Sequence, residues 1–233
     1  MKDMTVALHG CDFLENLAGG SGGAISMEGG ESADISRSSF EDNMAGENGA
    51  AVASASSSLD ISETILDGNE AEGVGGGIYA EEVDMDILNS LLSGNSGYDG
   101  GGIYLDIDSK ATVSNITAAN RSAYRTGGIG GESTAAAIHD CIFWKNGVDL
   151  ADHYSATYSF FASLLQGEGN FTGTPGFTPG PFGDFYLDPG SVCIDAGSRT
   201  AEAAGLADRT TRANDTPDTG QVDLGYHYPL REN

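Results

Sequence analysis

Short runs in which apolar and polar residues alternate cover the first two thirds of the chain. The runs at 59–62 (Leu-Asp-Ile-Ser) and 85–87 (Met-Asp-Ile) are examples. Because successive side chains of a β-strand point to opposite faces, this period of two predicts half-buried strands. Glycine-rich stretches such as 75–77 separate the runs and disfavour helix. The pattern therefore predicts short strands joined by tight turns.

The runs belong to an internal repeat. An Asn recurs at spacings of 27, 26, 26, 25 and 26 residues, and a glycine-rich stretch ending in Ile or Val follows each of the first five copies. Mostly apolar residues lie three and eight positions before each Asn. In the fifth copy Thr112 lies eight positions before the Asn, and Val113 fills the apolar position after a one-residue deletion. The landmarks are Asn16, Asn43, Asn69, Asn95, Asn120 and Asn146; Phe13, Phe40, Leu66, Leu92, Thr117 and Phe143; and Leu8, Ile35, Ile61, Ile87, Thr112 and Ile138. Landmarks kept in phase over so many copies indicate a solenoid.

A period near 26 fits both a leucine-rich repeat and a β-helix. At the position where a leucine-rich repeat has its middle apolar residue, the six copies have Cys, Ser, Thr, Ser, Asn and Cys. The second half of each unit is also too rich in glycine for a helix. We therefore expect an all-β fold: a single-stranded right-handed parallel β-helix of about six rungs over residues 1–157, with two or three strands per rung. Rungs stacked ~4.8 Å apart place Ile over Ile and pair each strand with the next copy. The Asn is expected at the bend, in a left-handed conformation, with its amide stacked along the rod.

Residues 158–233 break this rhythm and contain all six prolines. They are expected to form a last rung and an irregular cap across the C-terminal end of the rod. An open end is an unpaired strand edge, and a cap protects it from end-to-end association. No comparable sequence precedes the first copy. The N-terminal edge is therefore expected either to continue into missing sequence or to self-associate end-on.

Phe-x-x-Asn followed by Gly-Gly-Ala-Ile, as at 13–16 and 22–25, resembles the repeats of chlamydial polymorphic outer-membrane proteins and related bacterial surface β-helices. The likeness covers residues 5–150. The stretches 183–197 and 215–229 resemble the closing segment of secreted bacterial right-handed β-helix proteins. This resemblance implies the fold, and an extracellular or cell-surface location, better than it implies an activity. No apolar stretch long enough for a secretory signal follows Met1, so we expect a leader to have been removed.

Composition narrows the possible partners. The 233 residues carry 10 Lys and Arg against 35 Asp and Glu, a net charge of −25. This charge excludes nucleic acid as a partner, and no run approaches the ~20 apolar residues of a membrane span. We expect a non-catalytic extracellular or cell-surface module for display, adhesion or carbohydrate binding, with glycans or a surface polysaccharide as partners. The acidity alone is also typical of salt adaptation, which would carry no functional meaning.

One column of side chains is a candidate glycan site. If Ile78 and Ile103 point inward, Tyr79 and Tyr104 lie one above the other on the outside. Two positions further along, the column is acidic in four of five rungs: Glu28, Ala55, Glu81, Asp106 and Glu132. Flat tyrosine faces and carboxylates that accept sugar hydroxyls predict ligand binding by Tyr79, Tyr104, Glu81, Asp106 and Glu132. The alternative is a solvated strand face in which tyrosine serves β-propensity.

Stacked carboxylates also attract a hard cation, and calcium prefers several carboxylate and carbonyl oxygens. The sequence requires no cofactor. The candidate calcium ligands are Asp84, Asp86, Asp106 and Asp108 on the rungs, or Asp208, Asp215, Asp218 and Asp223 in the tail.

The alternative function is a carbohydrate-active enzyme, a polysaccharide lyase or glycoside hydrolase, or a fragment of one. Glu81 and Asp106 on neighbouring rungs would lie about 5 Å apart, the separation of a retaining glycosidase pair. A lyase needs a base and a cation beside a uronate. Arg121 and Arg125 are the only close basic pair on the rungs, where salt bridges to nearby carboxylates explain them equally well, and the net charge disfavours an acidic polysaccharide. A deep groove with converging carboxylates or an Arg–Asp constellation would favour the enzyme, and a smooth rod the module. We assign no catalytic residue.

The histidines and cysteines add little chemistry. His9 and His139 follow stacked positions and are expected to face outward at opposite ends of the rod. Cys11 and Cys141 occupy one repeat position five rungs apart, too far to form a disulfide. Cys141 with Cys193 is the only disulfide pairing considered.

Overall fold

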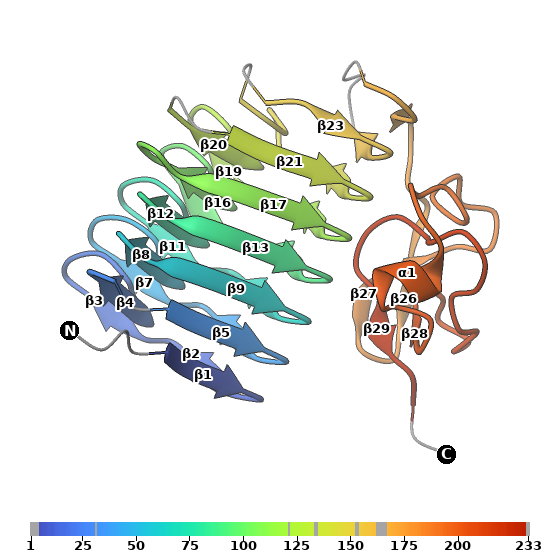
Figure 1. Ribbon diagram of the computed structural model, residues 1–233, viewed down its shortest axis with the longest axis horizontal. Helices are drawn as coiled ribbons and strands as arrows, with labels where there is room; N and C mark the ends of the chain where they lie inside the picture. Colours follow the sequence, from blue (N-terminus) through green and yellow to red (C-terminus); the bar gives the residue numbers. More distant parts are fainter. Residues whose placement is uncertain are drawn as a thin grey trace.

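The computed structural model describes residues 5–30, 32–120, 122–132, 135–151, 154–161 and 167–231. Within these ranges the chain forms a parallel β-solenoid, and a C-terminal segment lies beside the stacked rungs (Figure 1). Each complete rung contributes one short strand to each of four parallel sheets, named A to D. The expected all-β solenoid of about six rungs is confirmed. Each rung has four strands, however, where two or three were expected.

The strands of each sheet come from equivalent positions of successive rungs. Sheet A contains β1 (Thr5–His9), β5 (Ser32–Ser36), β9 (Ser58–Ser62), β13 (Asp84–Leu88), β17 (Lys110–Ser114), β21 (Ala135–His139) and β23 (Ala156–Thr157). Sheet B contains β2 (Asp12–Leu14), β6 (Ser39–Glu41), β10 (Ile65–Asp67), β14 (Leu91–Ser93), β18 (Thr117–Ala119), β22 (Ile142–Trp144), β24 (Phe160–Phe161) and β25 (Phe171–Thr172). Sheet C contains β3 (Leu17–Ala18), β7 (Met44–Ala45), β11 (Glu70–Ala71), β15 (Ser96–Gly97) and β19 (Ser122–Ala123). Sheet D contains β4 (Ile25–Glu28), β8 (Val52–Ala55), β12 (Ile78–Glu81), β16 (Ile103–Leu105) and β20 (Ile129–Gly131).

The core consists of columns of like residues. Ile35, Ile61, Ile87 and Val113 stand in register in sheet A, so Val113 fills the slot expected of it. These side chains are almost fully buried. Aromatic rings stack in sheet B, for example Phe13 on Phe40 with ring centroids 4.6 Å apart. Stacking therefore buries the apolar edge that a single rung would expose.

An asparagine ladder runs along the bend before sheet C. The Asn43 amide donates to Asn69 Oδ1 over 2.8 Å, and Asn69 donates in the same way to Asn95. The left-handed residue is the one before each ladder position, with φ of 52° at Asp42 and 68° at Gly68. The expectation that the repeated Asn itself takes this conformation is therefore wrong.

The fifth copy of the repeat is shifted by one residue from its expected alignment. Leu92 pairs in register with Ala118 and not with Thr117, and Asn120 takes the left-handed slot with φ of 54°. The residue that follows Asn120 lies outside the described residues. Asn120 suggested the wrong alignment because Asn suits a left-handed slot as well as a ladder.

The C-terminal segment contains β26 (Phe177–Gly180), β27 (Gly183–Leu187), α1 (Ala201–Ala204), β28 (Arg209–Thr210) and β29 (Tyr228–Pro229). The expectation that it caps the C-terminal end of the rod is wrong, because the segment turns back and packs along the side of the rungs (Figure 1). Tyr186 and Tyr228 pack against Leu91, and Leu224 packs against Ile142. The outward apolar side chains of sheet B supply this contact.

Polar residues at the corner between sheets A and B also hold the segment. Glu63, Asn89, Asn115 and Asp140 occupy this corner on four consecutive rungs, each with a positive φ. Glu63 binds Arg209 at 2.7 Å, and Asn89 accepts from the His227 backbone over 2.7 Å. Asn115 accepts from Arg199, and Asp140 accepts from Ser198. We call these four residues the corner column.

Cys11, Cys141 and Cys193 are all free. Cys141 belongs to the solenoid core, whereas Cys193 packs between sheet B and the C-terminal segment, so the disulfide considered from the sequence does not form. Burial raises the pKa of the Cys141 thiol to about 12, which makes it an inert filler.

Candidate functional site

The tyrosine column expected to bind glycans is stacked but covered. Tyr79 and Tyr104 have ring centroids 6.3 Å apart and planes 12° apart. The two residues are only 9% and 6% exposed, because they cluster with Ala53 and Val74 outside sheet D. The expectation of open ring faces is therefore wrong, since the loop that carries Val74 folds over them. A sugar cannot stack on either ring face in this arrangement.

The acidic residues of this column interact with the tyrosine. The Tyr79 hydroxyl lies 3.0 Å from Glu81 Oε2 and 2.9 Å from Asp106 Oδ2, so the two carboxylates compete for its one proton. Burial, together with these hydrogen bonds, raises the pKa of Tyr79 above its ordinary value. Glu132 follows β20 in the next rung. Tyr79 and Glu81 line a hollow of about 260 Å³ on sheet D, shared with Glu28, so a role for these acids in ligand binding stays a prediction.

The four rung aspartates proposed as calcium ligands do not converge. Asp86 stands on the outer face of sheet A in register with Asp60, and Asp84 stands opposite Lys110. Asp106 turns instead to the Tyr79 hydroxyl. Asp84 and Asp86 are separated from Asp106 because sheet A and sheet D form different faces of the solenoid. Among the described residues, the group of three acidic side chains close enough to share an ion is Asp195, Asp218 and Asp223, which includes two of the four tail candidates.

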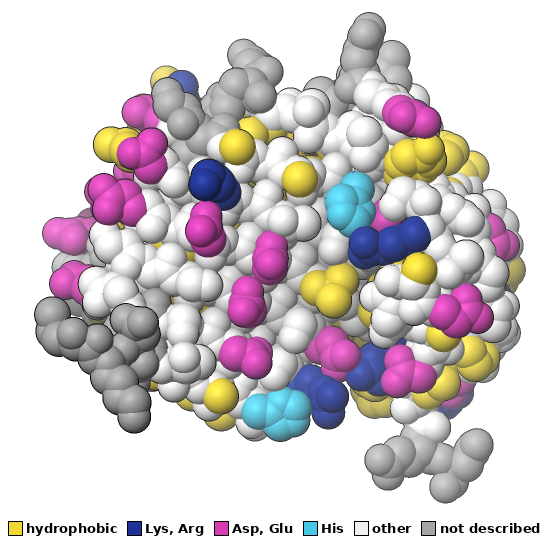
Figure 2. All heavy atoms as spheres, in the orientation of Figure 1, with side chains coloured by type: hydrophobic (Ala, Val, Ile, Leu, Met, Phe, Trp, Pro, Cys, Tyr) yellow, Lys and Arg dark blue, Asp and Glu magenta, His cyan; other side chains and the backbone are white. Residues whose placement is uncertain are grey.

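The outer face of sheet A carries a polar row. Asp34, Asp60 and Asp86 stand in register on three successive rungs, followed by Thr112. Figure 2 shows acidic side chains crossing this face, with basic side chains gathered where it meets the C-terminal segment. Burial raises the pKa of Asp60, and the charges of Asp86 and Asp34 add to the rise. This face therefore presents closely spaced hydrogen-bond acceptors along the rod.

Two hollows adjoin on this face. One, of about 420 Å³, is lined by Asp84, Lys110 and Ala136 among others. The other, of about 330 Å³, is bounded by Ser114 on sheet A and by Arg199 of the C-terminal segment. Both include Asp86 and Thr112, so together they form one shallow groove, which we call the sheet A groove.

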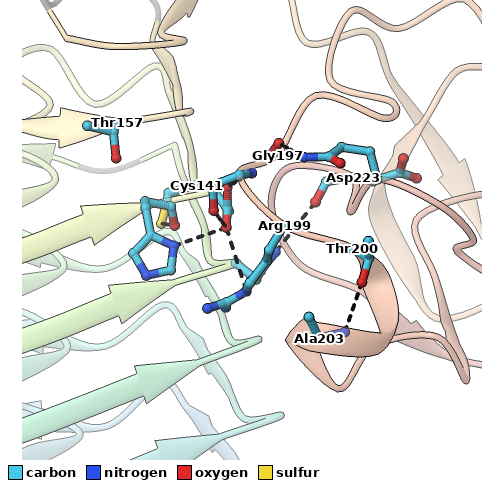
Figure 3. Close-up of polar contacts among 12 residues, drawn as sticks. Cys141, Thr157, Gly197, Arg199, Thr200, Ala203 and Asp223 are labelled. Carbon is cyan, nitrogen blue, oxygen red and sulfur yellow. Dashed lines mark hydrogen bonds and ion pairs between the residues drawn. The ribbon is translucent and has the colours of Figure 1, made fainter.

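An Asp–His–Arg constellation stands beside the sheet A groove. Asp140 is fully buried, and its Oδ2 lies 3.0 Å from His139 Nδ1 and 3.9 Å from Arg199 Nε. Figure 3 shows Arg199 reaching from the C-terminal segment to the end of the solenoid strands. Burial by itself would raise the pKa of Asp140, but hydrogen bonds from His139 and Ser198 outweigh it and lower the pKa. Asp140 thus orients the His139 ring, which is 23% exposed and outward-facing as expected.

Sequence reasoning missed this constellation. The His139-Asp140 dipeptide at the end of a predicted strand was the available signal, because a carboxylate next to a histidine can orient its ring. Arg199 lies about sixty residues further along the chain, and nothing local connects it to this corner. The structure describes one member of the basic pair on the rungs. Arg125 lies 3.6 Å from Asp99, and Arg121 lies outside the described residues.

The chain belongs to the right-handed β-helix family, because the family model described as "Right handed beta helix region" matches residues 7–170. The right-handed solenoid expected from the repeat is thereby confirmed. No curated protein and no solved structure matches the chain. Across the described residues, none of the helices has the length and apolar character needed to cross a membrane.

Proposed function

We propose that the chain is a non-catalytic, extracellular carbohydrate-binding module and that a glycan lies along the sheet A groove. The observation that carries this proposal is the continuity of the two hollows at Asp86 and Thr112, on a face where β9 and β13 expose aspartates. Carbohydrate hydroxyls are recognised by carboxylate and hydroxyl side chains of this kind.

The spacing and charge of the groove narrow the ligand. Rungs ~4.8 Å apart place Thr112 next to Asp86 in the groove, at a distance comparable to one sugar residue. Asp60 and Asp34 continue this row beyond the groove, so a linear chain that extends past the groove can meet them in turn.

Asp84 and Asp86 offset Lys110 and Arg199 in the groove lining, so the groove itself carries no net positive charge. The neighbouring aspartates of the row and the net charge of −25 would repel an acidic polysaccharide. A neutral or amine-bearing glycan is therefore the favoured class.

A glycan array followed by titration calorimetry tests this proposal. Asp86→Asn is expected to weaken binding of a neutral glycan by about tenfold or more, because one charged hydrogen-bond acceptor is lost. Glu70→Gln removes a comparable exposed acid from sheet C and should leave binding unchanged. Absence of any glycan hit, or equal losses in the two variants, would contradict the proposal.

A second function, a carbohydrate-active enzyme, is favoured by one observation, the His139–Asp140–Arg199 constellation. A carboxylate-oriented imidazole can move a proton at neutral pH, and a guanidinium can neutralise a developing anion. Incubation with a polysaccharide library should then release unsaturated or reducing ends, and His139→Ala should abolish the release. His9→Ala is the control, because His9 occupies the matching strand end of the first rung. Release that survives His139→Ala would exclude this site.

Cell-surface display is supported by the resemblance of the repeat to bacterial surface β-helices, including the chlamydial polymorphic outer-membrane proteins. Surface labelling of intact source cells tests the location. A chain protected from labelling until the cells are lysed would contradict it.

A further inference from the structure

We propose that Asp195, Asp218 and Asp223 form a calcium site that fastens together two loops of the C-terminal segment. One carboxylate oxygen from each residue lies within 4.8 Å of the others. Asp218 and Asp223 are almost fully buried, whereas Asp195 is exposed at the mouth of the cluster. Two buried carboxylates side by side are costly unless a positive charge compensates them.

Among the buried carboxylate oxygens of the cluster, the described hydrogen bonds leave one unpaired. Asp218 Oδ2 lies 2.9 Å from the Asp223 backbone nitrogen and 2.8 Å from His227 Nε2, and so accepts from both. Asp218 Oδ1 is buried, and the described residues give it no hydrogen-bond partner. A buried carboxylate oxygen without a donor is a strong metal-ligand candidate, because an unmet acceptor is costly.

The basic side chains near the cluster face the second oxygen of Asp218 and one oxygen of Asp223. His227 faces Asp218 Oδ2, and its second ring nitrogen faces the Gly225 carbonyl at 2.9 Å. Arg212 lies 3.6 Å from Asp223 Oδ2, which also accepts from the Thr211 hydroxyl. Neither basic side chain is recorded in contact with Asp218 Oδ1 in the described part of the chain. Three carboxylates against two basic groups leave room for an added cation.

The donor set selects calcium. Ca–O distances of about 2.3–2.6 Å suit carboxylate oxygens that lie within 4.8 Å of one another. Calcium also tolerates irregular coordination, which backbone carbonyls and water can complete. Magnesium binds at about 2.1 Å and keeps more of its waters, which suits two buried carboxylates less well. Zinc sites in proteins typically include nitrogen or sulfur ligands, but His227 Nε2 is already hydrogen-bonded to Asp218.

The position of the cluster gives the ion a structural consequence. Asp223 also accepts from the Asp195 backbone over 2.7 Å, so the loops that contain Asp195 and Asp223 already touch. The Asp223 backbone carbonyl faces the Asn115 amide of the corner column at 3.4 Å. An ion held here would therefore stabilise the segment in its docked position.

Titration calorimetry and thermal unfolding of the full chain, after chelator treatment, test the site. Calcium should bind at one site and raise the unfolding temperature, whereas magnesium at the same concentration should do so weakly. Asp195→Asn is the decisive variant. Asparagine tolerates the φ of 54° at this exposed position, so the variant should fold like the wild type in chelator and bind calcium at least about tenfold more weakly.

Asp60→Asn is the matched control, because the sheet A row is the other place where calcium could gather. This variant should keep the calcium response of the wild type. The proposal is overturned if calcium produces neither heat nor a temperature shift, if Asp195→Asn responds like the wild type, or if Asp60→Asn removes the response.

Discussion

In the corner column, one backbone conformation serves two purposes. Its members adopt a left-handed conformation that turns the chain from sheet A to sheet B. The same turn directs their side chains toward the C-terminal segment, where Asn89, Asn115 and Asp140 become almost fully buried. Short polar side chains suit both tasks, because Asn and Asp tolerate a positive φ and offer hydrogen-bond acceptors.

Asp140→Asn tests the docking role of the corner column. The substitution keeps a residue that accepts a positive φ, but it replaces one oxygen that receives the Ser198 backbone or hydroxyl. We expect a loss of about 2–3 kcal/mol in the free energy of unfolding, measured in urea. Asp42→Asn, at an exposed left-handed position before sheet C, should change stability by less than about 0.5 kcal/mol.

The lowered pKa of Asp140 also predicts a pH dependence. The carboxyl group is more acidic in the folded chain than in the unfolded chain, so the folded state gains stability once both are ionised. This contribution is fully present above the unfolded pKa of about 4 and is lost as pH falls through the lower folded pKa. The stability difference between wild type and Asp140→Asn should therefore be constant near neutral pH and shrink in acid. A difference that grows on acidification would contradict the lowered pKa.

At the scale of elements, the asparagine ladder joins strands that share few side-chain contacts. Sheet C strands are only two residues long. Asn69 compensates by accepting from Asn43 and donating to both Asn95 and the Phe40 carbonyl. The ladder thus fixes the position of a bend that short strands alone would leave weakly paired.

Replacement of a ladder residue should be far more costly than replacement of the left-handed residue at the same bend of another rung. Asn69→Gly leaves the Asn43 amide and backbone without their acceptor, and we expect it to cost about 3 kcal/mol or more. Asn120→Gly changes a left-handed residue that lies outside the ladder, and we expect less than about 1 kcal/mol. Urea midpoints of the two variants provide the comparison, and equal losses would show that the ladder adds nothing.

The sequence predicted those parts of the fold that depend on neighbouring repeats. The inward columns at Ile35, Ile61 and Ile87 follow from local alternation and from the period. The path of the C-terminal segment could not be predicted, because its contacts join residues as distant as Asn89 and His227. The cover over Tyr79 depends on a loop whose direction alternation does not specify, and Arg199 reaches Asp140 only through the docked segment.

At the scale of the whole molecule, the net charge of −25 acts against the compact state. Most of the carboxylates are exposed, so salt should screen their repulsion. We expect the unfolding temperature to rise with sodium chloride from low to physiological ionic strength, as measured by circular dichroism. Calcium chloride at matched ionic strength should raise the unfolding temperature further than sodium chloride does. An equal rise with the two salts would show that calcium has no specific effect.

The position of the C-terminal segment changes how the solenoid can come apart. A solenoid in which each rung contacts only its neighbours can unfold rung by rung from one end. Here one stretch of chain is tied to four consecutive rungs, at Glu63, Asn89, Asn115 and Asp140. None of these rungs can separate from its neighbours without breaking contacts to the C-terminal segment that the other three rungs share. The middle of the rod is therefore expected to unfold as one cooperative unit.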